Sequence, residues 1–197
     1  RMAKNRNTVN EFIGQLLEPS MEFAKKDVES IFNYAKKNGF DGDRLMPWDF
    51  SFWSERYQEA EYSLNAEELK PYFRLENCID AVFSLANRLY GLEFVELDNV
   101  PVYHEDVKVY EVKDADGRHM ALFYADFFPR ASKRGGAWMT EFRGQCIKDG
   151  VEYRPFISTV MNFTKPTADT PSLITHDEFT TFPHEFGHAL HGILAEG

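Results

Sequence analysis

The chain has 197 residues, of which 43% are hydrophobic and 27% charged, the balance of a globular protein with a sizeable core. Its formal net charge of −10 argues against a nucleic-acid-binding protein, because such a surface needs a basic face. No run approaches the roughly 18 apolar residues of a membrane span, and no signal-peptide segment follows the polar start. We expect a cytoplasmic protein that contacts neither nucleic acid nor membrane, and the oligomeric state stays open. Two cysteines, Cys78 and Cys146, are too few for a disulfide framework, so we expect reduced thiols.

Residues 1–91 form a helical segment. Its first apolar face follows a helical period, with an expected interruption at Pro19-Ser20, and consists of Phe12, Leu16, Leu17, Met21 and Phe23. The pattern ends at Lys36-Lys37-Asn38-Gly39, where basic residues in a last turn precede a glycine. An aromatic cluster over 48–53 opens a second short helix and is best interpreted as core. Residues 75–90 are clearly amphipathic and end at Gly91.

Residues 92–165 change to a strand period and predict a small sheet. The ranges 92–97 and 107–112 alternate between apolar and polar residues. A turn is expected over 114–117, and residues 119–125 form a further apolar run. The ranges 107–112 and 119–125 are therefore predicted to pair as a hairpin. Further strands are expected over 138–147 and 155–163.

Residues 166–197 comprise a linker and a helix that begins near Thr175. Thr175 and Glu178 have the spacing of a capping box, in which each side chain binds the backbone amide of the other residue. The predicted fold class is therefore α+β and mainly helical, with a small mixed sheet next to the last helix.

The motif that indicates chemistry lies in this last helix, His184-Glu185-Phe186-Gly187-His188. Histidines at i and i+4 share one helix face and can bind one zinc ion. Glu185 follows the first histidine and is placed to take a proton from a water molecule that the metal activates. We interpret His184 and His188 as metal ligands and Glu185 as the catalytic base, against the alternative of two ordinary helical histidines.

The third ligand is not evident in the sequence. His191 lies about 10 Å along the helix axis from His184 and is expected to be a packing residue or one that supports a ligand from behind. The metzincin pattern requires glycine and histidine where this chain has His191 and Leu194. Glu196 lies too close along the same helix to fold back onto the ion. A glutamate beyond residue 197 is therefore the expected third ligand, as in His-His-Glu zinc peptidases.

With these residues in view, the sequence resembles the thimet oligopeptidase family, in particular its bacterial branch of oligopeptidase A and dipeptidyl carboxypeptidase (peptidyl-dipeptidase). The resemblance covers essentially the whole chain and is carried by ranges 71–73, 87–91, 102–104, 126–139 and 162–163 and by the zinc motif extended to His191. Phe and Gly inside the zinc motif make this match narrower than the bare spacing, and Lys133-Arg134-Gly135-Gly136-Ala137-Trp138 favours the bacterial branch.

The resemblance implies a two-lobed zinc metallopeptidase of the zincin type that hydrolyses short peptides, either internally or by releasing C-terminal dipeptides. The three segments 1–91, 92–165 and 166–197 would be parts of one larger catalytic domain, truncated at both ends and inactive alone. One alternative is a non-catalytic scaffold that binds peptides. A structural zinc protein is a weaker alternative, because structural zinc sites usually use closely spaced pairs of cysteines and neither cysteine here has such a partner.

Two expectations concern the surroundings of the motif. By analogy with other zinc peptidases, an edge strand pairs with the substrate backbone, and the range 156–163 is the candidate, against a purely structural strand. Gly135-Gly136 could admit a close substrate or simply form a tight turn. Pro183 stands where the family usually has an aromatic or aliphatic residue, so the helix is expected either to kink there or to restart at Pro183.

Overall fold

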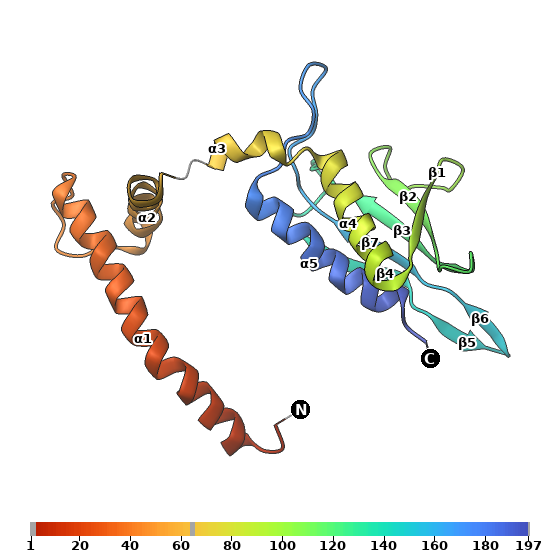
Figure 1. Ribbon diagram of the computed structural model, residues 1–197, viewed down its shortest axis with the longest axis horizontal. Coiled ribbons are helices and arrows are strands. Elements are labelled where there is room, and N and C mark those ends of the chain that lie inside the picture. The colour runs from red at the N-terminus through yellow and green to blue at the C-terminus, as the bar shows by residue number, and fades with distance from the viewer. Residues whose placement is uncertain (1–2, 64–65, 197) are drawn as a thin grey trace. The chain divides into compact units, whose positions relative to one another are not determined.

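The computed structural model describes residues 3–63 and 66–196, which fall into two compact units, Arg1–Asn65 and Ala66–Gly197 (Figure 1). Helices and a small mixed sheet are both present, which confirms the mixed helix-and-sheet class predicted from the sequence. In the described ranges, no helix is long and apolar enough to span a membrane. Both cysteines are free, as expected, with Cys78 buried and Cys146 exposed.

The first unit consists of two helices, α1 (Arg6–Lys37) and α2 (Pro47–Tyr62). Its core is small: Ile31 and Ala35 of α1 pack against Trp53 of α2. Aromatic edge-to-face contacts extend this core, because the Tyr34 ring lies 6.4 Å from Trp53 and 5.6 Å from Tyr57, measured between ring centroids. The aromatic cluster predicted to be core is therefore confirmed only for Trp53, since Trp48 and Phe52 are exposed.

The expected interruption of the first helix is wrong, because α1 is continuous through Pro19. Proline lacks the amide hydrogen that would bond to the carbonyl of Gln15, so one helical hydrogen bond is lost at this point. At the next residue the Ser20 hydroxyl donates to the Leu16 carbonyl over 2.6 Å, a side-chain bond that bends a helix rather than replacing the lost one. The rest of this 32-residue helix continues on both sides of the proline.

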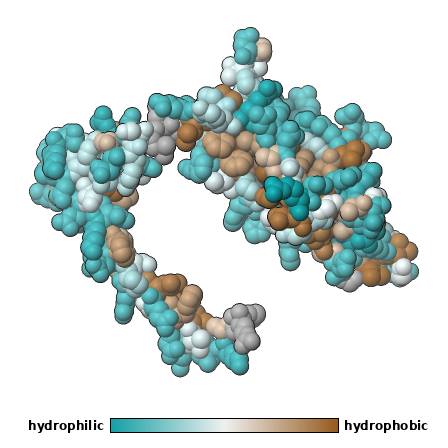
Figure 2. Space-filling model, viewed as in Figure 1, coloured by the Kyte–Doolittle hydropathy of each residue, from teal (hydrophilic) through white to brown (hydrophobic). Residues whose placement is uncertain are grey.

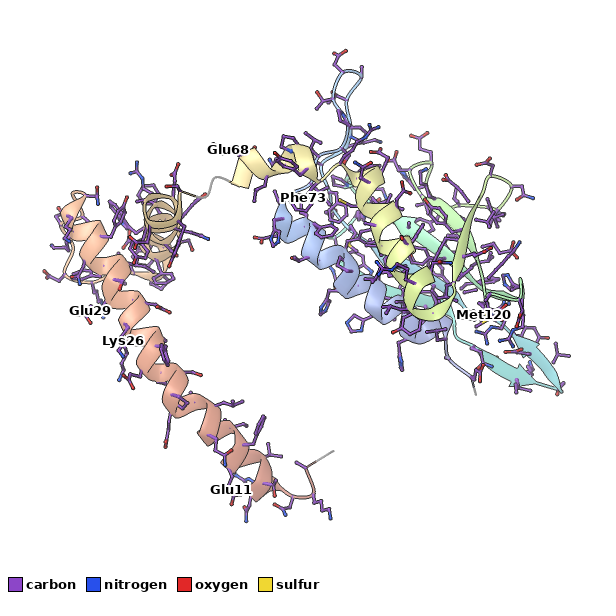
Figure 3. All side chains as sticks on the ribbon, viewed as in Figure 1. Glu11, Lys26, Glu29, Glu68, Phe73 and Met120 are labelled. Atoms are coloured by element: carbon purple, nitrogen blue, oxygen red, sulfur yellow. The ribbon has the colours of Figure 1, made fainter. Side chains whose placement is uncertain are left out.

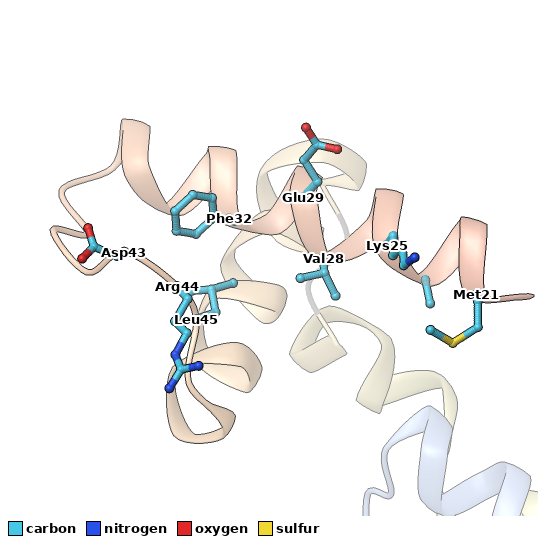
Figure 4. A pocket seen from close by; sticks show the side chains of 9 residues that line it. Met21, Lys25, Val28, Glu29, Phe32, Asp43, Arg44 and Leu45 are labelled. Carbon is cyan, nitrogen blue, oxygen red and sulfur yellow. The ribbon is translucent and has the colours of Figure 1, made fainter.

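The predicted apolar face of α1 is exposed within this unit, and its charged side chains, such as Glu11 and Glu29, also project into solvent (Figures 2 and 3). Figure 4 shows where part of this face meets the segment after the helix. A pocket of about 480 Å³ lies there, between Val28 and Phe32 of α1 and Arg44 and Leu45 of the following loop.

The second unit contains α3 (Ala66–Leu69), a 3₁₀ turn (Lys70–Tyr72), α4 (Leu75–Tyr90) and α5 (His176–Ile193). Its main sheet has the order β1-β2-β3-β7-β4. The strands of this sheet are β1 (Glu93–Leu97), β2 (Lys108–Lys113), β3 (His119–Asp126), β4 (Trp138–Arg143) and β7 (Phe156–Val160). Only β3 and β7 run parallel, and β5 (Cys146–Lys148) with β6 (Val151–Tyr153) forms a separate hairpin.

Most predicted elements of this unit are confirmed. The helix over 75–90 is α4, the turn over 114–117 joins β2 to β3 in an antiparallel hairpin, and the last helix begins after Thr175. The single strand expected over 138–147 is wrong: β4 ends at Arg143, a register shift falls between Glu141 and Arg143, and β5 starts a new hairpin. A bulge of this kind bends a strand and ends its pairing, which no hydrophobic pattern reveals.

The core of the unit lies between the sheet and the helices α4 and α5, which run along one face of it (Figure 1). Side chains alternate across the sheet, so neighbouring residues belong to different clusters. Phe123 and Ile157 belong to the core cluster that includes residues of both helices, whereas Val109 and Tyr124 belong to a separate cluster that contains no helix residue. The two faces of the sheet therefore have different surroundings.

A buried ion cluster lies on the face away from α5 and fixes the loop that leads into β4. Asp126 is fully buried, and its Oδ1 accepts hydrogen bonds from Arg130 Nη1 and Lys133 Nζ, each over 2.9 Å. Lys133 also donates to the carbonyls of Asp126 and Phe128, over 3.0 Å and 2.7 Å. Burial raises the pKa of Asp126, but the bonds from Arg130 and Lys133 outweigh it and hold the pKa below its usual value. Lys133 thus ties the middle of the loop between β3 and β4 back to the start of that loop.

Helix α5 approaches the sheet closely at one glycine. A Cβ atom on Gly192 would lie 2.5 Å from Cδ1 of Ile157 and 2.8 Å from Oε1 of Glu141, so no larger residue fits without displacement. Ile157 is fully buried and cannot move aside freely. Gly187, five residues earlier in the same helix, has nothing within 4 Å of the equivalent position.

These two glycines give a matched pair of variants. Gly192→Ala should lower the free energy of unfolding by about 1–3 kcal/mol, because the added methyl group overpacks the helix–sheet contact. Gly187→Ala should leave it unchanged or raise it by up to about 1 kcal/mol, because alanine favours an unobstructed helix. Urea unfolding of the wild type and both variants measures this difference. Equal effects at the two positions would contradict the close contact at Gly192.

The ion cluster is tested by a double-mutant cycle. Lys133→Met should cost about 3 kcal/mol of unfolding free energy, because it leaves the Asp126 carboxylate buried with fewer partners. It should also raise the pKa of Asp126. The stability that this carboxylate contributes is present above its unfolded pKa of about 3.9 and is lost as the pH falls through the lower folded value, so the loss should begin at higher pH in the variant. The double variant Asp126→Asn/Lys133→Met should cost less than the sum of the single changes, and strict additivity would contradict the pairing.

Candidate metal centre

Helix α5 has one buried and one exposed face, and the motif residues divide between them. The buried side chains recur at helical spacing and are Phe182, Phe186, Ala189 and Ile193. His184, His188 and His191 lie on the opposite, exposed face. The helix therefore packs with its aromatic residues and presents its histidines outward.

The two histidines of the motif are neighbours in space. The ring centroids of His184 and His188 are 5.0 Å apart, and the ring planes meet at 78°. Glu185 follows His184 and is partly buried. Two exposed imidazoles one helical turn apart can both bind one zinc ion through ring nitrogens, and the adjacent carboxylate is available for proton transfer. The residues present therefore fit two positions of a zinc site.

The described ranges 3–63 and 66–196 contain no group of three His, Cys, Asp or Glu side chains placed to hold one ion. His191 does not complete such a group. It lines a different hollow of about 420 Å³, together with Tyr90 of α4 and Leu194 and Ala195 after α5. His191 is exposed, so the packing role expected of it stays a prediction.

The start of α5 is fixed by the predicted capping box. The Thr175 hydroxyl accepts a hydrogen bond from the Glu178 amide over 3.1 Å, and the Glu178 carboxylate accepts one from the Thr175 amide over 2.8 Å. The ring of Phe73 packs beside this first turn, 5.1 Å from Phe179 between centroids (Figure 3). The first turn is therefore held by backbone and side-chain contacts together.

A restart of the helix at Pro183 is wrong, because α5 runs unbroken from His176 to Ile193 with Pro183 inside it. An internal proline costs a helix about 3 kcal/mol. Phe182 and Phe186 flank the proline and are both buried in the core, so tertiary packing outweighs that cost. His184 consequently belongs to the same continuous helix as His188.

The end of α5 is fixed by Arg154, a residue that the sequence analysis does not single out. Its Nη2 donates to the Ile193 carbonyl over 2.6 Å, and its Nη1 donates to the Ala195 carbonyl over 3.2 Å. Its Nε donates to the Met120 carbonyl of β3 over 2.8 Å. A cation at a helix C-terminus satisfies the last free carbonyls and interacts favourably with the helix dipole. Arg154 therefore links the end of the motif helix to the sheet.

The aromatic residue inside the motif anchors the middle of the helix. Outside its own helix, Phe186 contacts three rings of the core, with centroid distances of 5.9 Å to Phe83, 5.6 Å to Phe94 and 5.5 Å to Phe123. These rings come from α4, β1 and β3. Because Phe186 lies between His184 and His188 in sequence, its packing sets the direction in which both imidazoles point.

The strand proposed to pair with substrate is not at an edge of the sheet. β7 is bonded to β3 on one side and to β4 on the other, so its backbone has no free edge. The expectation for 156–163 is therefore wrong, and the reason is topological: β4 precedes β7 in sequence but lies outside it. β4 is the edge strand on this side of the main sheet.

A glycine turn leads into this edge strand. Gly136 has a φ of 90°, a left-handed conformation that favours glycine, and nothing lies within 4 Å of a Cβ at Gly135 or Gly136. The Asn162 side chain donates to the carbonyls of Arg134 and Gly136, over 3.0 Å and 2.7 Å. The tight turn is thus present, and the space beside it is open.

Comparison with known proteins identifies the family. The model of peptidase family M3 matches residues 1–197. The chain is 40% identical to a dipeptidyl carboxypeptidase of Salmonella typhimurium and 36% identical to oligopeptidase A of Escherichia coli, over 99% and 98% of its residues. It is 42% identical to a probable cytosolic oligopeptidase A of Arabidopsis thaliana over 95% of its residues. The chain spans 28% of the length of each of these relatives. The resemblance inferred from the motifs is confirmed, and the chain belongs to peptidase family M3.

Proposed function

We propose that the complete protein containing these residues hydrolyses short peptides with the aid of a zinc ion held by His184 and His188. The observation that supports this most directly is the pair of exposed imidazoles, 5.0 Å apart between ring centroids, on a helix fixed at both ends. The family match and the names of the relatives, which include a dipeptidyl carboxypeptidase and two oligopeptidases, point to the same class of substrate.

Each motif residue has a role in this proposal. A zinc ion supplies Lewis-acid chemistry and makes a water molecule acidic enough to react near neutral pH. His184 and His188 hold the ion through ring nitrogens on the exposed face of α5. Glu185 accepts the proton of the attacking water and transfers it to the departing amine. Phe186 keeps the imidazoles aimed outward through its ring contacts in the core.

Catalytic zinc sites have three protein ligands and one open position. The two imidazoles therefore leave one ligand to come from outside the described residues, and we propose a glutamate of the longer protein. It follows that residues 1–197 alone should lack turnover. A cytoplasmic location is also a proposal: among the relatives, one is named cytosolic and another chloroplastic/mitochondrial.

The substrate backbone is proposed to pair with the free edge of β4. Addition of a strand to an exposed sheet edge is a general mode of peptide binding. β4 lies close to the motif helix, because the Glu141 side chain is within reach of Gly192. The open space around Gly135-Gly136 at the start of this strand would admit a peptide backbone.

The role of Glu185 predicts a specific pattern in the complete protein. Glu185→Gln should lower turnover of a quenched fluorescent peptide by about 10³-fold, because the amide cannot accept the proton, while zinc content stays unchanged. Glu196→Gln removes the same charge from the exposed segment after α5 and should retain full turnover. Undiminished turnover in Glu185→Gln would exclude the assigned role.

The metal ligands are tested separately by elemental analysis. His184→Ala and His188→Ala should each lose bound zinc, because a site with one imidazole removed keeps too few ligands. His191→Ala is the matched control and should retain it, since His191 lines a different hollow. Stoichiometric zinc in His184→Ala, or its loss in His191→Ala, would require a different ligand set. A protein that binds peptides without zinc would instead favour a non-catalytic scaffold.

A further inference from the structure

A further pocket lies on the face of the sheet that points away from the motif helix. Ile157 and Glu141 approach Gly192 of α5, so the alternate side chains of β7 and β4 point to the other face. The pocket, of about 490 Å³, lies on that other face and is lined by Trp138, Thr140 and Phe142 of β4. It is thus beside the same edge strand as the proposed substrate backbone, but behind the sheet as seen from α5.

The lining of this pocket carries more positive than negative charge. Three cations, Arg130, Lys133 and Arg134, face one carboxylate, Asp126. The Asp126 oxygens already have partners, because Oδ1 accepts from Arg130 and Lys133 and Oδ2 accepts from the Tyr103 hydroxyl over 3.1 Å.

The neighbouring acid Asp106 does not cancel the excess. It is paired with Lys165, whose Nζ lies 2.7 Å from its Oδ2. The pocket is therefore locally positive in a chain whose formal net charge is −10.

Arg134 is the cation available to a ligand. Its side chain is exposed, and its guanidinium lies over the ring of Trp138, 5.1 Å from the centroid. Among the described residues, no carboxylate forms an ion pair with it. Stacking on an aromatic ring holds a guanidinium in place while leaving its planar donors free for a carboxylate. Arg134 also immediately precedes the Gly135-Gly136 turn into β4.

A peptide paired with the free edge of β4 would place every second side chain over this pocket. Cross-strand neighbours share a face, so these side chains would lie beside Trp138 and Thr140, and the intervening ones would lie on the α5 side. We propose that the pocket is a specificity subsite for an acidic side chain of the substrate, with Arg134 as its ion-pairing residue. This inference rests on the proposed peptidase function and on β4 as the substrate-binding strand.

The test uses the complete protein and a series of quenched fluorescent peptides. Glu, Gln and Lys are placed at each position in turn, and kcat/KM is measured. At one position, or at positions two apart, Glu should be preferred over Gln by about fivefold, the value of a partly exposed ion pair. Arg134→Glu should reverse this preference in favour of Lys, and Arg134→Ala should abolish it. Lys148→Glu makes the same charge change on the exposed β5–β6 hairpin, outside the pocket, and should leave the preference intact.

The outcomes separate this inference from the function on which it rests. If the wild type cleaves peptides in a Glu185-dependent manner but shows no acidic preference at any position, the subsite is wrong and the peptidase function stands. A preference that survives Arg134→Glu, or one that disappears equally in Lys148→Glu, also overturns the subsite. If the wild type cleaves no peptide at all, both proposals fail.

Discussion

The packing of α5 against the sheet is the constraint on which the candidate site depends. Phe186 enters a core of rings from α4, β1 and β3, and Phe182 packs against Phe127 and Phe163. Gly192 lets the helix backbone approach Ile157 without a side chain between them. The capping box at Thr175 and the Arg154 guanidinium then fix the two ends. A helix held along one face and at both ends presents His184 and His188 in one orientation, which a metal site requires.

The edge strand β4 has a different neighbour on each face of the sheet. On one side β4 meets α5, and on the other it lines a pocket with the guanidinium of Arg134 at its rim. The buried pair of Asp126 and Lys133 holds the loop before β4, and Asn162 holds the glycine turn within it. Hydrogen bonds therefore connect the edge strand, the turn before it and the loop that lines the pocket.

Features encoded by neighbouring residues were predicted well from the sequence. The motif spacing, the Thr175–Glu178 cap, the amphipathic α4 and the β2–β3 hairpin each depend on a few consecutive residues, and each is present. The failures were non-local. Both prolines sit in continuous helices, which for Pro183 depends on the packing of flanking phenylalanines, and β7 is internal because β4 returns outside it. Arg154 was missed because its partners lie 34 to 41 residues away, a separation that no local pattern records.

We propose that His184 and His188 hold a catalytic zinc ion, with a third ligand supplied from elsewhere in the longer protein. The most direct measurement is anomalous diffraction at the zinc absorption edge from crystals of the complete protein. One strong peak is expected within about 2.1 Å of a ring nitrogen of each histidine, with Glu185 beside it but not bound to it and a third protein ligand from outside residues 1–197. A peak that lies away from these two imidazoles, or no peak in crystals of a protein that cleaves peptides, would contradict the proposal.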